Sequence, residues 1–261
     1  MEQTLLEIHD LSVSFRMYDR GFEQTDLQVI AGLSLTVYPG EIVAVAGSSG
    51  AGKSLLASAI LGILPSNAAV KGQLLYKGRE LTPALQKQLR GTEIALVPQS
   101  VEFLDPLMKV GAQAEGHSRT AGSADKRREL FRRFGLPDGT EKMYPFQLSG
   151  GMARRVLVSA ALMTDAELII ADEPTPGMSL DQALEALKMF RELADEGKAV
   201  ILITHDIDLA ASFADRVAVF YEGTTVETVS ASDFKAGTLS HPYSKALWRA
   251  LPQNGFEYER K

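Results

Sequence analysis

Cysteine is absent from this sequence of 261 residues, and tryptophan occurs once. Disulfides, cysteine-ligated iron–sulfur clusters and thiolate zinc sites are therefore excluded, and a reducing compartment is expected. The apolar runs of the chain are too short for a membrane span, which needs roughly 20 residues. The first residues, MEQTLLEIHD, include acids where a secretory signal carries bases, so we expect no export signal.

An excess of basic residues is also missing. Lys and Arg total 27 against 33 Asp and Glu, which gives a formal net charge of −6. Broad nucleic-acid binding requires a basic surface, so we expect no nucleic-acid partner. An apolar share of 45% at this length is enough to form a hydrophobic core.

Alternating apolar and polar residues predict strands in the N-terminal part of the chain. Leu11, Val13 and Phe15 alternate with serines, and residues 33–37 follow the same period of two. Residues 42–46 are apolar throughout, as in a strand buried on both faces of a parallel sheet. Further strands are expected at 168–171, 199–203 and in a hairpin at 216–229, and helices at 53–64, 152–163, 181–196, 206–214 and 241–251. This alternation predicts an α/β fold.

The texture of the chain changes between residues 82 and 148. Apart from the apolar residues 94–97, charged and helix-forming residues dominate there, and 125–134 has the apolar spacing of a short helix. We interpret this part as an inserted helical subdomain. The chain is then one domain, with an α/β core at 1–98 and 150–230, a helical subdomain at 99–149 and a C-terminal tail at 231–261.

Residues 47–54, GSSGAGKS, match the phosphate-loop pattern G-x-x-x-x-G-K-[ST]. Glycines let backbone N–H groups turn toward phosphates, Lys53 supplies a cation to the β/γ oxygens, and the Ser54 hydroxyl ligates Mg²⁺. A chance glycine-rich turn is the alternative, but the segment lies between an apolar strand and a helix, as the motif requires. The residues expected to bind ATP are Gly47, Ser48, Ser49, Gly50, Ala51, Gly52, Lys53, Ser54 and Leu55.

Two acids follow the apolar residues 168–171, at the strand end where ligands bind in open α/β sheets. Asp172 can hold Mg²⁺, and Glu173 can accept a hydrogen bond from the attacking water. His205 ends the next apolar strand and can bond the γ-phosphate and order that water. A solvated acid and a structural histidine are the alternatives for Glu173 and His205.

Residues 148–152, LSGGM, complete a set with Gln99, Asp172 and His205, and on these motifs the chain resembles the nucleotide-binding subunits of ABC transporters over nearly its whole length. The resemblance implies a P-loop NTPase (RecA-like) ABC cassette with an N-terminal antiparallel β region and an inserted α-helical subdomain. It also implies an ATPase whose cofactors are ATP and Mg²⁺.

In that family two cassettes close head to tail over two ATP molecules. The resemblance implies that Ser149, Gly150 and Gly151 contact the γ-phosphate bound by the partner; by themselves these residues would form an ordinary N-cap turn. Gln99 matches the glutamine that touches Mg²⁺ and the water. The implied catalytic residues are Glu173, His205 and Gln99, and the implied Mg²⁺ ligands are Ser54, Gln99 and Asp172.

Phe15 lies where the family carries an aromatic residue that stacks on adenine, and Tyr18 is a second candidate. An inward-facing strand residue is an equally good interpretation of Phe15. Residues 174–181, PTPGMSLD, depart from the family pattern because Ser179 takes the place of an aspartate in the loop that links the two ATP sites. This departure predicts weaker or unequal coupling between the sites, whereas hydrolysis is still expected.

Within the family, residues 105–107, 143–147 and 241–252 are similar to peptide and nickel importer subunits. Residues 62–65, and the lack of a cysteine-bearing extension after the tail, are more similar to nickel-import ATP-binding proteins. The expected function is to energise an importer for nickel or a metal chelate, or for di- or oligopeptides. Four widely separated histidines offer no nickel site, so other subunits would bind the cargo.

The expected partners are a second ABC ATPase subunit in a homo- or heterodimer, two permease subunits, and indirectly an extracytoplasmic solute-binding protein. The permeases are expected to contact residues 100–145, although the arginines of 125–134 are by default a solvated helix face. The expected location is peripheral, on the cytoplasmic face of the plasma (inner) membrane. The alternatives are a non-transport ABC ATPase acting on DNA or ribosomes, and a regulatory subunit that does not hydrolyse ATP.

Overall fold

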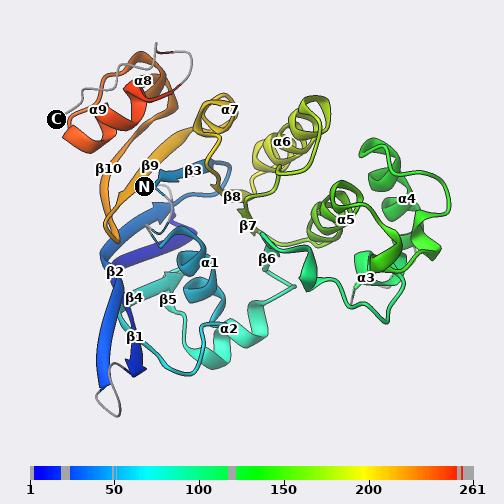
Figure 1. The fold of residues 1–261 in the computed structure, drawn as a ribbon, viewed down its shortest axis with the longest axis horizontal. Helices are drawn as coiled ribbons and strands as arrows, with labels where there is room; N and C mark the ends of the chain where they lie inside the picture. The colour runs from blue at the N-terminus through cyan, green and yellow to red at the C-terminus, as the bar shows by residue number, and fades with distance from the viewer. Residues whose placement is uncertain are drawn as a thin grey trace.

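The structure, a computed structural model, describes residues 3–18, 24–48, 50, 52–116, 122–251 and 254. These residues form two sheets and a group of helices at one end (Figure 1). A four-stranded sheet has the order β2-β1-β4-β5, and a six-stranded sheet has the order β10-β9-β3-β8-β7-β6. The strands are β1 Leu6–Tyr18, β2 Gln24–Val37, β3 Ile42–Gly47, β4 Ala68–Tyr76, β5 Arg79–Glu80, β6 Ile94–Val97, β7 Leu168–Asp172, β8 Ala199–Ile203, β9 Arg216–Tyr221 and β10 Thr224–Ser230.

The four-stranded sheet is antiparallel throughout. This sheet explains the alternation of apolar and polar residues in the sequence. Leu11, Val13 and Leu33 are fully buried on one face, while the intervening residues are more exposed. β1 and β2 are longer than the predicted strands, and register shifts near Leu11 bend the pair. The predicted N-terminal antiparallel region is confirmed.

The six-stranded sheet is parallel from β6 to β9, and β10 returns antiparallel to β9. Its all-apolar strands are buried on both faces, as predicted for β3, β7 and β8. Val43 and Val45 of β3 face one hydrophobic core, and Ile42, Ala44 and Ala46 face another. The predicted hairpin is β9–β10, and the α/β fold class is confirmed.

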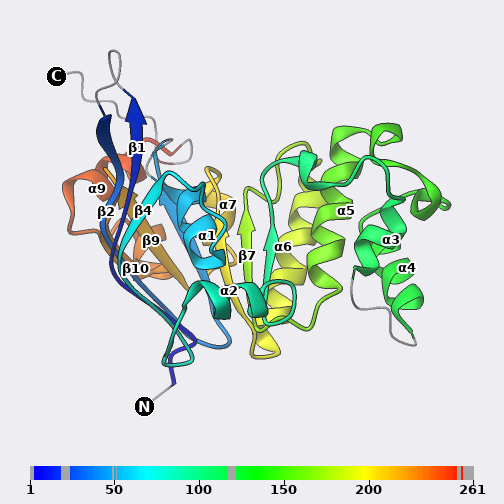
Figure 2. The same cartoon turned by 90° about the horizontal axis from the view of Figure 1, so that it is seen from below.

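The helices cover the two faces of this sheet unequally (Figure 2). α1 lies between the two sheets, where Leu56 and Ile60 join the core that also contains the antiparallel sheet. α5, α6 and α7 contribute to the core on the opposite face. The helices are α1 Lys53–Leu61, α2 Pro83–Leu89, α3 Val110–Glu115, α4 Ser123–Arg133, α5 Gly150–Leu162, α6 Leu180–Asp195, α7 Ile207–Ala211, α8 Ala231–Ala236 and α9 Pro242–Arg249, with 3-10 turns at Val101–Phe103, Thr140–Lys142 and Pro145–Gln147.

A third, smaller core lies partly in the predicted helical subdomain, 99–149, and partly on α5, which the prediction had placed in the α/β core. It joins Val110 of α3, Phe131 of α4 and Val156 of α5. The predicted helix at 125–134 is α4, which begins at Ser123. Some helices are shorter than predicted: α1 ends at Leu61 because Gly62 adopts a left-handed conformation with φ of 64°. Among the described residues, no helix combines the length and apolar character that crossing a bilayer would require.

Candidate nucleotide site

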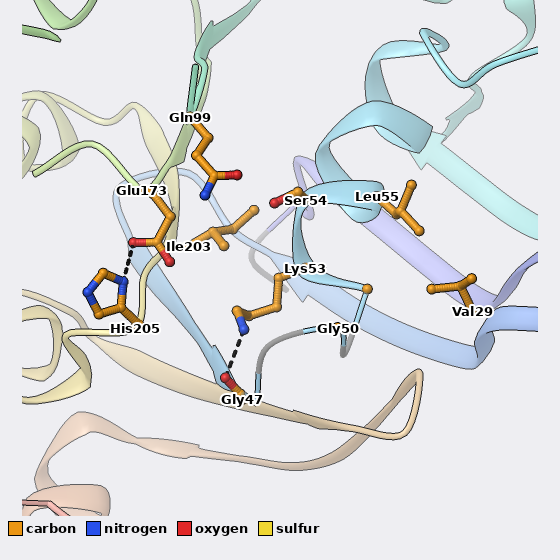
Figure 3. A pocket seen from close by; sticks show the side chains of 11 residues that line it. Val29, Gly47, Gly50, Lys53, Ser54, Leu55, Gln99, Glu173, Ile203 and His205 are labelled. Carbon is orange, nitrogen blue, oxygen red and sulfur yellow. Dashed lines mark hydrogen bonds and ion pairs between the residues drawn. The ribbon is translucent and has the colours of Figure 1, made fainter. Parts of the chain in front are cut away.

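Three adjacent strands, β3, β8 and β7, end at the same edge of the parallel sheet. An open cavity of about 440 Å³ lies at this edge and is drawn in Figure 3. Because parallel strands carry their carboxyl ends on one side, residues far apart in sequence meet there. The described residues that line the cavity are Val29, Gly47, Gly50, Gly52, Lys53, Ser54, Leu55, Gln99, Glu173, Ile203 and His205.

The phosphate loop requires glycine at both of its ends. Gly47 has φ of 154°, and a Cβ there would lie 2.2 Å from the Phe220 carbonyl oxygen. Gly52 has φ of 87°, and a Cβ there would lie 2.8 Å from Cγ1 of Ile30. The loop is thus pressed against β9 and β2, and any side chain at either position would displace it. Two further expected ATP ligands, Ser49 and Ala51, lie outside the described residues.

Lys53 opens α1 and is buried, with 9% exposure. Its ammonium donates to the carbonyl oxygens of Gly47 and Ser48, both at 2.8 Å. An ammonium has three N–H donors, so one remains for an incoming phosphate oxygen. Burial lowers the pKa of Lys53, and the nearby charges of Glu173 and Asp172 oppose that shift. The loop therefore holds its own cation in place.

Ser54 and Asp172 bring together two oxygen atoms that could ligate a metal. The Ser54 hydroxyl donates a hydrogen bond to the Asp172 carboxylate at 3.2 Å. Burial raises the pKa of Asp172, while the bond from Ser54 lowers it. No cluster of three or more acidic or histidine side chains suited to a metal occurs in the described parts of the chain. A hydroxyl, one carboxylate and the nearby Gln99 amide fit Mg²⁺, which binds few protein ligands and keeps water and phosphate oxygens.

Glu173 is held by the last residue of β8, Ile203, and by His205, which follows that strand. Its backbone N–H donates to the Ile203 carbonyl at 2.8 Å, and its carboxylate lies 2.9 Å from Nδ1 of His205. Its φ of 48° is unusual for a residue with a side chain and turns the chain sharply after β7. The Glu173 side chain is largely buried, whereas that of His205 is 74% exposed (Figure 3). His205 thus orients the Glu173 carboxylate, while the exposed side of the His205 ring remains open to a ligand.

Arg154 is a site residue that the sequence analysis missed. It lies on α5 with 8% exposure and donates to the carbonyl oxygens of Pro98, at 2.7 Å, and of Gln99. Burial lowers the pKa of Arg154, and the charges of Asp172 and Glu173 oppose this. It therefore fixes the backbone beside Gln99 and places a positive charge near both acids. Two consecutive arginines in an otherwise apolar helix were the available signal, since buried arginines need partners.

The expected signature residues lie apart from this cavity. Ser149 caps α5, its hydroxyl accepting from the Met152 N–H at 3.3 Å, and it is exposed together with Gly150. None of Ser149, Gly150 and Gly151 lines the cavity. A Cβ on Gly151 would lie 2.6 Å from the Gly177 carbonyl oxygen, so glycine allows the start of α5 to touch the loop after Glu173. Their role toward a partner's ATP stays a prediction.

Ser179 caps α6 in the loop that departs from the family pattern. Its hydroxyl accepts from the Gln182 N–H at 3.4 Å, and the Gln182 side chain accepts from the Ser179 N–H at 3.2 Å. This reciprocal pair is a capping box. Serine therefore supplies the helix cap that an aspartate could also supply, but without a charge.

Phe15 is not among the described residues that line the cavity. It lies in β1 opposite Leu27 and Ala68, and its half-buried ring packs against the core shared by the two sheets. This packing is the inward-facing arrangement that the sequence left open. Stacking of Phe15 on adenine stays a prediction, and the side chain of Tyr18 lies outside the described residues.

Replacing Asp172 by asparagine is expected to stabilise the nucleotide-free protein at neutral pH. A folded-state pKa above the ordinary 3.8 means that ionisation opposes folding, and the cost appears as pH rises through the folded-state value. Asparagine keeps an acceptor for Ser54 and removes the charge. Differential scanning calorimetry at pH 7 should show a rise of roughly 1–4 °C in melting temperature for Asp172→Asn, and the gain should shrink toward pH 4.

Asp138→Asn, at an exposed position, is the matched control and should leave the melting temperature unchanged. A lower melting temperature for Asp172→Asn would show that its charge is stabilised by its neighbours rather than penalised by burial.

Known proteins match most of this chain. The family described as ABC transporter matches residues 30–176. The oligopeptide transport ATP-binding protein OppD of Bacillus subtilis (strain 168) is 34% identical, in an alignment covering 95% of this chain and 72% of that protein. The dipeptide transport ATP-binding protein DppD of Lactococcus lactis subsp. cremoris (strain MG1363) is also 34% identical, with 96% and 74% covered.

Solved structures match the fold. A dimeric ATP-binding cassette in a post-hydrolysis state with ADP and Pi gives a TM-score of 0.74 at 24% identity, over 87% of this chain and 99% of that chain. A nucleotide-free ATP-binding cassette from an ABC transporter gives 0.72 at 19% identity, over 94% and 98%. The matched family and the two relatives show that this chain belongs to the ABC transporter family, among its ATP-binding proteins.

Proposed function

We propose that this chain binds and hydrolyses MgATP in a two-cassette assembly and thereby drives the import of peptides through membrane permeases. The observation that carries the proposal is the convergence of Lys53, Ser54, Gln99, Glu173 and His205 on one cavity. These residue types cover the tasks of ATP hydrolysis: phosphate binding, metal ligation, water activation and γ-phosphate recognition. The names of the relatives supply the cargo class, di- and oligopeptides.

ATP binding begins at the phosphate loop. The positive end of α1 and the third N–H of Lys53 attract the β- and γ-phosphates. Ser54, Asp172 and Gln99 would hold Mg²⁺, which neutralises phosphate charge when it is bound. The Glu173 carboxylate, held by His205, accepts a hydrogen bond from the attacking water, and Gln99 orients that water.

A second cassette would complete each site. Ser149 and Gly150 are exposed at the N-terminus of α5 and do not line this chain's own cavity. A helix N-terminus is suited to bind an anion, and we assign that anion to the γ-phosphate held by the partner. ATP then stabilises the closed pair, and hydrolysis removes the bridging phosphate.

Exposed apolar side chains suggest a surface on which the permeases could dock. Phe103 is 63% exposed, Leu107 87% and Phe146 76%, all within the predicted contact region or beside it. Large exposed apolar side chains are typical of protein interfaces. Phe103 also lines a cavity of about 430 Å³ together with Gln99 and Asp172, so the docking surface adjoins the nucleotide site. With this docking we also propose a peripheral location on the cytoplasmic face of the membrane.

Lys53→Ala is expected to weaken ATP binding by roughly 10- to 150-fold, the value of a hydrogen bond to a charged group. Isothermal titration calorimetry with the full chain measures this effect. Lys87→Ala, which removes an exposed lysine from α2, is the control and should bind ATP as the wild type does. Unchanged affinity for Lys53→Ala would contradict the assignment of the loop.

Ser149→Arg separates binding from turnover. Because Ser149 lies outside the chain's own cavity, ATP affinity should stay within about twofold of wild type, while turnover of the assembled transporter falls more than roughly 10-fold. Ser66→Arg, at an exposed turn residue, should change neither quantity. Loss of ATP affinity equal to that of Lys53→Ala would place Ser149 in the chain's own site and refute the two-chain arrangement.

Reconstitution with two permease subunits tests hydrolysis and cargo together. Peptide-loaded solute-binding protein should stimulate ATPase activity in vesicles, and Glu173→Gln should reduce the stimulated rate by roughly 10²- to 10⁴-fold while retaining ATP. Stimulation by Ni²⁺ or its chelate instead would support the nickel interpretation. A wild type without turnover beside its partners would indicate a regulatory subunit, and co-purification with nucleic acid or ribosomes would indicate a non-transport ATPase.

A further inference from the structure

The C-terminal helix α9 contacts the phosphate loop through one hydroxyl group. The backbone N–H of Ser48 donates to the Tyr243 hydroxyl at 2.9 Å, across 195 positions of sequence. α9 lies beside β9 and β10, far from the helical end of the molecule (Figure 1). A tail element is therefore bonded directly to the second residue of the loop that surrounds the phosphate cavity.

This contact completes the fixation of one peptide group. The Gly47 carbonyl oxygen accepts from Lys53 at 2.8 Å, so the C=O and the N–H of the Gly47–Ser48 peptide group both have partners. The preceding Gly47 leaves no room for a Cβ beside the Phe220 carbonyl. Orienting the Ser48 N–H toward α9 limits the rotation of the backbone at the start of the loop. The later N–H groups of the loop then need less reordering when a phosphate binds.

Tyr243 is itself held in place by β9. Its ring stacks on Tyr221, the last residue of β9, with centroids 4.0 Å apart and planes inclined by 26°. Stacked aromatic rings restrict each other's side-chain freedom and bury apolar surface. Phe220, the neighbour of Tyr221, is the residue pressed against Gly47. The strand that borders the loop thus also fixes the tyrosine that bonds to it.

The start of α9 is anchored independently to β10. The Glu227 carboxylate accepts from the backbone N–H groups of Ser240 at 2.6 Å and His241 at 3.2 Å. Burial by itself would raise the pKa of Glu227, but these bonds help to hold that pKa below its usual value. At the other end of α9, the Trp248 ring packs on Gly237, where a Cβ would lie 2.9 Å from it. The position of the Tyr243 hydroxyl is therefore set by a rigid support.

We propose that Tyr243 is a positioning residue for the phosphate loop, and that the tail helix α9 thereby tunes nucleotide affinity. The proposal rests on the proposed function, since it presumes that the loop binds ATP. The proposal assigns to the tail helix a role in the nucleotide site of the same chain. Tyr243 is not among the described residues that line the phosphate cavity, and it acts through Ser48.

Tyr243→Phe tests the proposal because it removes the hydroxyl and keeps the stacked ring. In the full chain, calorimetry should show dissociation constants for ATP and ADP that rise by roughly 2- to 10-fold. In the assembled transporter, KM for ATP should rise by a similar factor while kcat at saturating ATP stays the same. The melting temperature without nucleotide should not change, because an exposed N–H can bond to water instead.

Tyr221→Phe is the matched control: it removes the other hydroxyl of the stacked pair, which bonds to none of the loop residues that the structure describes, and should leave both dissociation constants unchanged. The proposal is wrong if Tyr243→Phe binds nucleotide as tightly as the wild type. It is also wrong if affinity falls only together with the nucleotide-free melting temperature, or if kcat falls at constant KM. A wild type that binds no ATP would instead contradict the proposed function, so the two failures are distinguishable.

Discussion

The hydrogen-bond register of three parallel strands is the constraint on which the nucleotide site depends. Ile203 of β8 lies opposite Val45 of β3 on one side and Asp172 of β7 on the other. The Glu173 N–H extends this pairing by one more bond to the Ile203 carbonyl. A slip of one residue in either pairing would move these side chains to the opposite face. Catalytic geometry is therefore inherited from backbone pairing in the sheet.

Buried charges at the sheet edge are compensated by one another. Lys53 and Arg154 lie near Asp172 and Glu173, and burial disfavours the ionised forms of Lys53, Arg154 and Asp172. The protein tolerates this cost because each charged group is hydrogen-bonded: Lys53 donates to the Gly47 carbonyl, Asp172 accepts from Ser54, and Arg154 donates to the Pro98 carbonyl. An edge that already holds opposed charges in fixed positions needs little reorganisation when MgATP adds its own.

The sequence anticipated the residues whose role is written in local pattern. The loop of Gly47 to Ser54 could be predicted because its glycines, lysine and serine are consecutive, and the acids because they end an apolar strand. The partners of Arg154 and Tyr243 could not be predicted, since each side chain bonds to backbone groups of a distant segment. Phe15 shows the converse limit: its position in a strand was predictable, but which neighbour its ring would face was not.

By itself the sequence determined the element types, the α/β class and the chemistry available, because periodicity and short motifs depend on neighbours along the chain. Tertiary structure alone decided which of those groups share a cavity. In the tertiary structure His205 contacts Glu173, and Ser149 is not among the described residues lining this chain's own cavity. The tail helix contacts the phosphate loop through Tyr243. These outcomes depend on strand order and register, which arise from contacts between segments distant in sequence and carry no local signature.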